Sequence, residues 1–471
     1  MPRARLAAAF AVTALNGLLA ACSMAPTYAA PVVAAPLAFK EAGPWTPAAP
    51  ADAAPRGEWW SVYSDPILSD LQVRAARANP TLGAATAAYD QARALAAQAR
   101  GSLWPQIDGS GLAQRTHRSD NAPLRTGGED EYSTRQVGGA LAWEIDLWGR
   151  VRNQVAASGA QAQASGADLE SVRLSLQAEL ADTYLALRGL DAQSRLLADT
   201  VAAYERALQL TQIRHAGGAA TGLDVGRAQT QLSTARAQLS DVSAQRALYE
   251  HAIAALVGES ASSFSLPPAQ IAFAVPEVPV STPSTLLQRR PDIAAAERRA
   301  GAANAQIGVA EAARFPTLSL GGSGGWQSAG GVDLLTAPNT FWMVGPQLAG
   351  SIFDGGRRRA AADAAKAAFE QSAATYRGVV LGAFRNVEDQ MALANQLALE
   401  AKDQDEAVAA AKRTEALAMI RYRQGAANYL EVVTAQTAAL QAERAALVLQ
   451  TRRLQASVDL TRALGGGWQG A

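Results

Sequence analysis

The sequence predicts an α+β membrane protein built from two internal repeats, each with one β-hairpin and one long helical hairpin. The repeats are visible because Trp104-Pro105 recurs as Phe315-Pro316 and Gly149-Arg150 recurs as Gly356-Arg357. Each half also contains alternating apolar and polar residues, which are typical of strands, and a long proline-free stretch with helical periodicity. Self-similarity over this distance indicates two equal halves with one plan.

A lipoprotein signal opens the chain. Arg3 and Arg5 precede a weakly apolar stretch, and Leu19-Ala20-Ala21-Cys22 has the form of a lipobox. We therefore expect residues 1–21 to be a signal peptide that is removed, Cys22 to carry a covalent lipid such as palmitate, and residues 22–64 to be a lipidated N-terminal spacer. Ser23 after the cysteine resembles lipoproteins sent to the outer membrane. An ordinary signal peptide with a chance cysteine is the alternative.

Alternation is clearest in the second expected strand. Its apolar face carries Val137, Gly139, Leu141, Trp143, Ile145 and Leu147. One face therefore suits lipid and the other water. The runs at 317–327 and 342–352 alternate in the same way, and the first strand, from Gln106 to about Arg115, is weaker. We expect hairpins at about 105–147 and 316–353, with strands near the ~9 to 11 residues that cross a membrane. Soluble hairpins lying on a core are the alternative.

Four strands cannot form a sealed barrel, because the smallest membrane barrels need about 8 strands and lipid does not tolerate an open sheet edge. Several chains must therefore contribute strands, and a homotrimer with a 12-stranded β-barrel, four strands per chain, is the simplest solution. The polar loop from His117 to Tyr132 suits an exposed connection. After the signal, no run reaches the ~18 to 20 apolar residues of a spanning helix.

Long helices follow each hairpin. From Gly149 to Ala216 the chain lacks proline, which is enough for a helix of about 100 Å. Its apolar residues recur at steps of four and three, which is a heptad seam. The first seam includes Leu187, Leu190, Leu197, Tyr204, Leu208 and Thr211, and the return seam includes Leu232, Val242, Arg246 and Tyr249. The second half repeats the plan in 357–423 and 430–464, so these hairpins suit a tube wall or a lever.

The expected domain organisation follows the repeats. The first repeat covers 65–260, a Pro-rich linker covers 261–285, the second repeat covers 286–464 and a C-terminal tail covers 465–471.

Composition excludes several function classes. The chain has 42 basic and 42 acidic residues, and no basic stripe with interleaved aromatic residues indicates a nucleic-acid partner. Cys22 is the only cysteine, which excludes an intramolecular disulfide and a multi-cysteine metal site. His117, His215 and His251 are scattered, without partners at metal-ligand spacing. We therefore expect no enzyme, no metal and no cofactor beyond the lipid.

Several motifs together resemble the outer-membrane factor family, the exit ducts of tripartite efflux pumps of the TolC and OprM type. They are the lipobox with its Pro-Thr-Tyr spacer, Trp59-Trp60, Asp65-Pro66, Arg290-Pro291-Asp292-Ile293, Arg314-Phe315-Pro316 and the segment from Gly425 to Gln436. The resemblance covers essentially all of the mature chain. It implies a trimer whose twelve-stranded outer-membrane barrel continues into a long periplasmic α-helical coiled-coil barrel, and docking with a periplasmic adaptor (a membrane fusion protein) and an inner-membrane pump. Conduction of small molecules through the channel would be passive.

In that family the turns of the helical hairpins lie at the pump-proximal tip. Here they fall at 216–222 and 424–428, so the candidate adaptor contacts are Gly217, Gly218, Gly222 and Gly425. Glycine offers a partner only backbone, and a purely conformational role in the turns is the alternative.

Relatives often carry an acidic residue just beyond the second tip, where this chain has Thr434. We expect Leu430 and Glu431 to narrow the channel aperture instead, with Asp224 or Arg227 as polar latches between neighbouring hairpins. A solvated face, with Asp224 capping its helix, is the alternative. Asp354 is expected to be an N-cap, and Arg357, Arg358 and Arg359 could meet lipid headgroups at the barrel base.

Two other functions stay open. The channel could serve type I protein secretion, or the chain could be a periplasmic coiled-coil lipoprotein scaffold without a pore.

Overall fold

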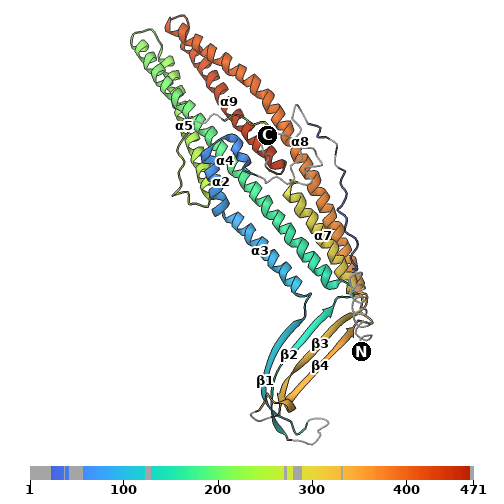
Figure 1. The fold of residues 1–471 in the computed structure, drawn as a ribbon. Coiled ribbons are helices and arrows are strands. Elements are labelled where there is room, and N and C mark those ends of the chain that lie inside the picture. Colours follow the sequence, from blue (N-terminus) through green and yellow to red (C-terminus); the bar gives the residue numbers. More distant parts are fainter. Residues whose placement is uncertain are drawn as a thin grey trace. The chain divides into compact units, whose positions relative to one another are not determined.

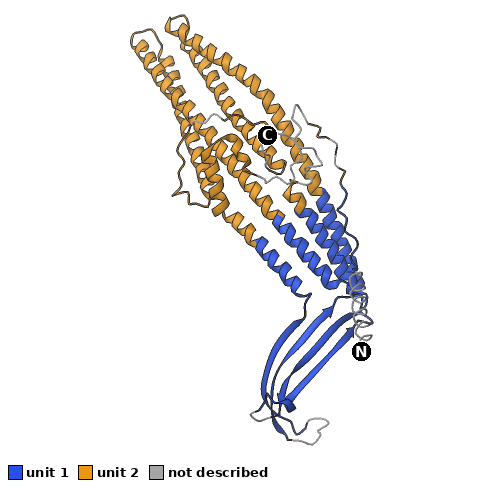
Figure 2. Cartoon of the chain, viewed as in Figure 1, with its two compact units in different colours: residues 1–32, 88–166, 295–377 blue, residues 33–87, 167–294, 378–471 orange. Residues whose placement is uncertain are grey.

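The computed structural model describes residues 23–34, 36, 38–41, 57–121, 129–269, 273–278, 289–329 and 333–466. The signal peptide, Cys22 and the tail from 467 lie outside these residues, as do parts of the spacer and of the Pro-rich linker. The chain forms two compact units (Figure 2): unit 1 contains 1–32, 88–166 and 295–377, and unit 2 contains 33–87, 167–294 and 378–471. Each unit therefore takes segments from both halves of the sequence.

Unit 1 contains a single four-stranded antiparallel sheet in the order β1-β2-β3-β4 (Figure 1). The strands are β1 (Gln106–His117), β2 (Glu131–Ile145), β3 (Thr317–Ser328) and β4 (Thr340–Ala349). They lie within the two hairpin ranges that the sequence predicts. β2 ends before Leu147 and β4 ends before Ile352, so these two residues were wrongly assigned to strands; the chain already turns toward the next helix at both positions.

The strand register confirms the expected apolar face. Val137 pairs with Trp326, Trp143 with Leu320, Ile145 with Leu318, Leu318 with Leu348 and Gly322 with Val344. Directly opposed residues point to the same side of a sheet, so the apolar sets of different strands form one continuous surface. The two edge strands are largely exposed, including Ile107 on β1 and Trp342 on β4. Within the part of the chain that the structure describes, β1 and β4 each have one side without a neighbouring strand.

Two pairs of helices follow the hairpins. α4 (Arg150–Ala216) and α8 (Arg357–Arg423) have 67 residues each, and α5 (Gly222–Leu256) and α9 (Tyr429–Ala463) have 35 each. The remaining elements are η1 (Trp59–Tyr63), α2 (Pro66–Ala78), α3 (Pro80–Gly101), α7 (Pro291–Ala312) and η2 (Ala337–Asn339). The predicted helices are confirmed to within about one turn. Within the described residues, none of the helices combines the length and apolar character needed to cross a membrane.

Local chemistry explains where these helices begin. Asp65 caps α2, since its Oδ1 accepts from the backbone N–H groups of Ile67 (2.7 Å) and Leu68 (3.2 Å), and Pro66 occupies the first turn, where no N–H is needed. Asp354 accepts from the N–H groups of Gly356 (2.9 Å) and Arg358 (3.2 Å), so its expected capping role at the start of α8 is confirmed. These contacts lower the pKa of the Asp354 carboxyl.

The heptad seam of the first helical hairpin lies in the core of unit 2. Leu190, Leu197 and Val242 form one buried cluster, as the sequence predicts. Tyr249 departs from the prediction, since its side chain is 38% exposed. Arg246 places a charged side chain at a seam position, where it pairs with Asp191 and Glu250.

Candidate functional site

The turns of the two helical hairpins have the same backbone design. Gly218 (φ 74°) and Gly425 (φ 76°) adopt the left-handed conformation directly after α4 and α8. The following residues close the helices, because Ala219 N donates to Arg214 O (2.7 Å) and Ala426 N donates to Arg421 O (2.9 Å). This is the Schellman arrangement, in which glycine carries no steric penalty.

The other two candidate glycines differ. Gly217 has no positive φ, and Gly222 is the first residue of α5. Gly218 and Gly425 thus have the backbone conformation that favours glycine, whereas Gly217 lies in the same turn without a positive φ.

Asp224 lies in a complete capping box. The Thr221 hydroxyl accepts from Asp224 N (3.2 Å), and the Asp224 carboxylate accepts from Thr221 N (3.0 Å) and from the Thr221 hydroxyl (2.8 Å). Arg227, one turn along the same helix, approaches Asp224 at 3.7 Å. The capping interpretation of Asp224 is thus confirmed, and its carboxylate is already bound within its own hairpin.

The three aperture candidates on the second hairpin lie in the first turns of α9. Leu430 is 46% exposed. Glu431 faces α8, where Arg421 Nη1 approaches its carboxylate at 3.4 Å. Thr434 donates its hydroxyl hydrogen back to Leu430 O (2.9 Å), so it is engaged within its helix. The second tip therefore presents an exposed leucine beside an ion pair that joins α8 to α9.

A tyrosine cluster joins the two hairpins behind their tips. Tyr422 and Tyr429 lie with ring centroids 5.3 Å apart, and Tyr204 from α4 belongs to the same buried cluster. Arg214 of the first hairpin donates to Tyr422 O (2.7 Å) and lies over the Tyr422 ring at 4.6 Å. Burial raises the pKa of Tyr429 to about 12. The two hairpins are therefore packed against each other behind their tips.

A groove follows the same hairpins between α5 and α9. Its volume is about 590 Å³. The polar lining includes Arg227, Thr230, Thr437 and Arg444, and the apolar lining includes Leu223 and Val433. The groove therefore presents both polar and apolar side chains.

Sequence reasoning missed a buried ionic network farther along the first hairpin. Asp191 accepts from Arg188 (2.8 Å) and from Arg246 (2.6 Å), and Ala269 N donates to it at 3.2 Å. The side chains of Arg188 and Asp191 are 1% and 2% exposed. Arg246 also pairs with Glu250 at 3.0 Å. The network ties α4 and α5 to the segment after α5, and the only sequence signal was an arginine at a seam position.

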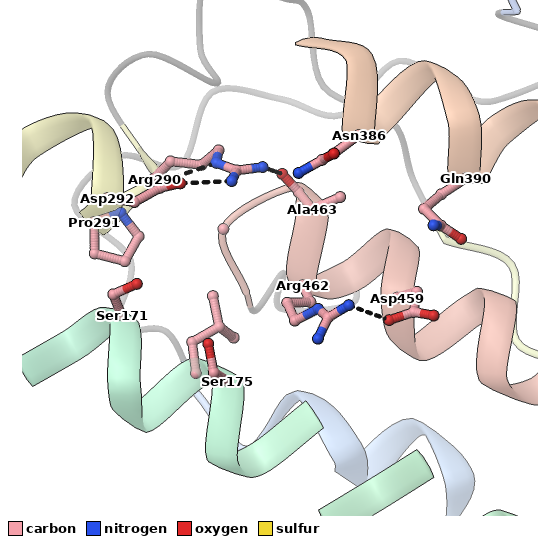
Figure 3. Close-up of a pocket in the computed structure, with 12 residues that line it drawn as sticks. Ser171, Ser175, Arg290, Pro291, Asp292, Asn386, Gln390, Asp459, Arg462 and Ala463 are labelled. Atoms are coloured by element: carbon pink, nitrogen blue, oxygen red, sulfur yellow. Dashed lines mark hydrogen bonds and ion pairs between the residues drawn. The ribbon is translucent and has the colours of Figure 1, made fainter. Parts of the chain in front are cut away.

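Sequence reasoning also missed a polar cavity of about 270 Å³ between the start of α7 and the end of α9 (Figure 3). Arg290 donates to both carboxylate oxygens of Asp292 (3.0 and 2.6 Å) and to Ala463 O (2.8 Å), which is one of the last carbonyls of α9. Arg462 pairs with Asp459 at 2.7 Å on another wall. The Arg290-Pro291-Asp292 motif therefore holds the C-terminal end of α9 to α7.

Asp182 of α4 has an unusual environment. Its Oδ1 is buried without a hydrogen-bond partner. Burial, with a contribution from Asp459, raises the pKa of Asp182 to about 8.

Among the described residues, no group of three or more His, Cys, Asp or Glu side chains could hold a metal ion.

Comparison with known proteins identifies the family. The sequence model described as "Outer membrane efflux protein" matches residues 71–259 and 282–466. The chain belongs to this family. The match spans both halves of the chain, including both helical hairpins.

Relatives within the outer membrane efflux protein family align over nearly the full length. The chain is 36% identical to outer membrane protein OprJ of Pseudomonas aeruginosa, over 98% of this chain and 96% of OprJ. It is 32% identical to the pyoverdine export outer membrane protein OpmQ of Pseudomonas aeruginosa, over 96% and 95%. The solved structure of the outer-membrane channel OprN matches with a TM-score of 0.86 and 30% identity, over 95% of this chain and all of that one.

These matches confirm the family that the sequence motifs indicate, and with it the outer-membrane efflux channel class. They also show that this chain shares the fold of a solved outer-membrane channel, with long helices joined to a four-stranded sheet. Membership of a channel family agrees with the expectation that the chain is not an enzyme.

Proposed function

We propose that three copies of this chain form the exit duct of a tripartite efflux pump, which conducts small molecules passively from a periplasmic adaptor and an inner-membrane pump to the exterior. The observation that carries the proposal is the family match over both halves, combined with a sheet whose two edge strands lack a neighbour on one side. Efflux-channel membership favours this function over the scaffold without a pore, which has no use for an apolar sheet face.

The unpaired strands support the trimer. Backbone N–H and C=O groups at a sheet edge cannot stay unpaired in lipid. Pairing β4 of one copy with β1 of the next would satisfy both edges, and three copies would supply the twelve strands of a barrel.

The equal element lengths support two internal repeats. α4 and α8 agree in length, as do α5 and α9, and the two tips share one turn design. The proposed first repeat covers 65–260 and the proposed second repeat covers 286–464. A lipid on Cys22 would anchor the chain to the outer membrane.

The hairpin tips are the proposed pump-proximal end. Leu430 and Glu431 would narrow the aperture, with Thr434, Asp224 and Arg227 nearby as its polar surroundings. The adaptor would contact the turns at Gly217, Gly218, Gly222 and Gly425 and continue along the groove between α5 and α9. Substitution of Glu431 by Gln would remove its pairing with Arg421 and raise the open fraction in single-channel recordings.

Thiol labelling in intact cells tests the spanning barrel. Asn121 lies in the loop between β1 and β2, and the native Cys22 would be blocked by its lipid. We expect Asn121→Cys to react with a membrane-impermeant thiol reagent in intact cells. The matched control is Asp199→Cys, at an exposed position of α4, which we expect to react only after the outer membrane is permeabilised.

If Asn121→Cys reacted only after permeabilisation, the hairpin loops would be periplasmic and the proposed barrel would be rejected. Reaction of both variants in intact cells would show that the reagent had crossed the outer membrane. The labelling would then be repeated at lower reagent concentration until Asp199→Cys no longer reacts in intact cells.

A further inference from the structure

A second cavity, with a volume of about 420 Å³, lies within unit 1 beside the residues that follow Cys22. Its lining combines apolar and charged residues. The apolar lining consists of Met24, Pro26, Ile307 and Phe315, and the charged lining of Glu311, Arg314 and Lys366. A pocket with this lining suits an amphipathic ligand.

The charged lining has an excess of one positive charge. Glu311 pairs with Lys366 at 2.7 Å and with Arg314 at 2.7 Å. These contacts lower the pKa of the Glu311 carboxyl, so it stays ionised and fixes both cations. The Lys366 and Arg314 side chains are still 52% and 46% exposed. An ammonium has three donors and a guanidinium has five, so both cations keep donors for an anion.

The N-terminal segment contributes two of the four apolar lining residues, Met24 and Pro26. Asn304, which is buried, donates to Pro26 O (2.8 Å), Tyr28 donates to Glu297 O (3.1 Å) and Ser23 donates to Asn153 Oδ1 (3.2 Å). Gly308 allows the close approach, because a Cβ there would lie 2.6 Å from the Cβ of Ala25. Met24 and Pro26 therefore form a wall of the cavity only while this segment is docked.

The cavity lies at the helix-proximal end of the sheet. Phe315 precedes β3 by two residues and stacks on Trp148 at 4.7 Å, and Trp148 donates to Pro316 O (2.8 Å). Trp104 just before β1 and Phe353 just after β4 are 75% and 90% exposed. Exposed aromatic residues at one end of membrane strands are typical of the level of the lipid headgroups.

We propose that this cavity binds an anionic phospholipid of the periplasmic leaflet, with its phosphate between Arg314 and Lys366 and an acyl chain along Phe315 and Met24. The inference rests on the proposed function only for the position of the sheet across the outer membrane. Arginine and lysine both form charge-assisted hydrogen bonds with phosphate oxygens, and the adjoining apolar residues favour a lipid over a free ion.

The test uses the full-length protein, purified in detergent and mixed with phosphatidylglycerol or phosphatidylcholine. Native mass spectrometry counts the lipid molecules retained per chain. We expect the wild type to retain phosphatidylglycerol preferentially. The double variant Arg314→Gln/Lys366→Gln should lower that retention at least about fivefold, because each basic residue near a lipid surface contributes measurably.

Two further variants sharpen the result. Gly308→Val should displace the N-terminal segment and also lower phosphatidylglycerol retention. The charge-matched control Arg93→Gln/Arg100→Gln removes two cations on α3 in the same unit and should leave retention unchanged. Equal retention of the two lipids by the wild type, or unchanged preference in Arg314→Gln/Lys366→Gln, would overturn the proposal.

Inorganic phosphate separates the two possible sources of the anion. Displacement of phosphatidylglycerol by inorganic phosphate alone would reassign the cavity to a free anion and reject the lipid. Failure of the proposed function is recognised separately: Asn121→Cys labelling reports on the barrel whether or not any lipid is retained.

Discussion

Removal of the Asp191 carboxylate should destabilise the helical hairpin far more than removal of any exposed acid on the same helix. Asp191 accepts from two arginines at 2.8 and 2.6 Å, and its side chain is 2% exposed. In Asp191→Ala, Arg246 keeps Glu250, but Arg188 loses its carboxylate partner while its Nη2 already lacks a hydrogen-bond partner. A buried charge left without its counter-ion costs about 3–5 kcal/mol.

Asp199 supplies the matched comparison. It lies on α4 as well and approaches Arg195 at 3.9 Å, with side chains 77% and 60% exposed. An exposed pair of this kind contributes about 0–1 kcal/mol, so Asp199→Ala should leave stability almost unchanged. Asp191→Asn keeps the shape but removes the charge, and we expect an intermediate loss.

The measurement is the midpoint of urea unfolding in detergent, followed by helical circular dichroism. Midpoints are compared because an assembled membrane protein need not unfold in one step. If Asp191→Ala had the same midpoint as Asp199→Ala, the buried network would contribute nothing measurable and the reasoning from burial would be refuted.

Three further predictions concern other parts of unit 2. Arg290→Ala should cost about 2–4 kcal/mol of stability and so lower the urea midpoint, because Asp292 and the end of α9 lose a charged donor. A midpoint equal to that of the wild type would contradict this prediction. The raised pKa of Asp182, about 8, means that the folded chain keeps a proton that the unfolded chain releases above about pH 4, so this group's contribution to stability falls as pH rises from about 4 to 8. The difference between the midpoints measured at both ends of that range should be smaller in Asp182→Asn than in the wild type, and an unchanged difference would contradict this prediction. Gly425→Ala should lower the stability of the folded chain by about 1–2 kcal/mol, because alanine disfavours the left-handed φ at this position. Gly226→Ala, in open space within α5, should raise the stability by about 0.5–1 kcal/mol. Equal effects of the two substitutions in thermal scans would exclude a conformational role for Gly425.

The sequence was sufficient for the strands and long helices because their periodicity is local. The alternation around Val137 and the heptad steps through Leu190 and Leu197 depend on neighbours a few residues away, and both apolar sets lie where expected. The ends were less certain: Leu147 carries on the alternation in the sequence, but the backbone has already left the strand.

Contacts between distant segments could not be predicted. Asp191 and Arg246 are 55 positions apart, and Arg290 reaches a carbonyl 173 positions later, so no local pattern marks either contact. Asp224 illustrates the opposite case, because a threonine three residues earlier is a local capping signal. The aperture residues stay predictions, since a single chain contains only one wall of any opening.

The two unpaired strand edges have a genetic consequence. In the proposed ring of three sheets, every chain meets both of its neighbours. A chain with one blocked edge can therefore still join a ring through its other edge and prevent closure. If such a chain were made in equal amount with the wild type and mixed at random, only about one ring in eight would be free of it. A mutation that spoils β1 or β4 should therefore be dominant, whereas a mutation that prevents folding altogether should be recessive.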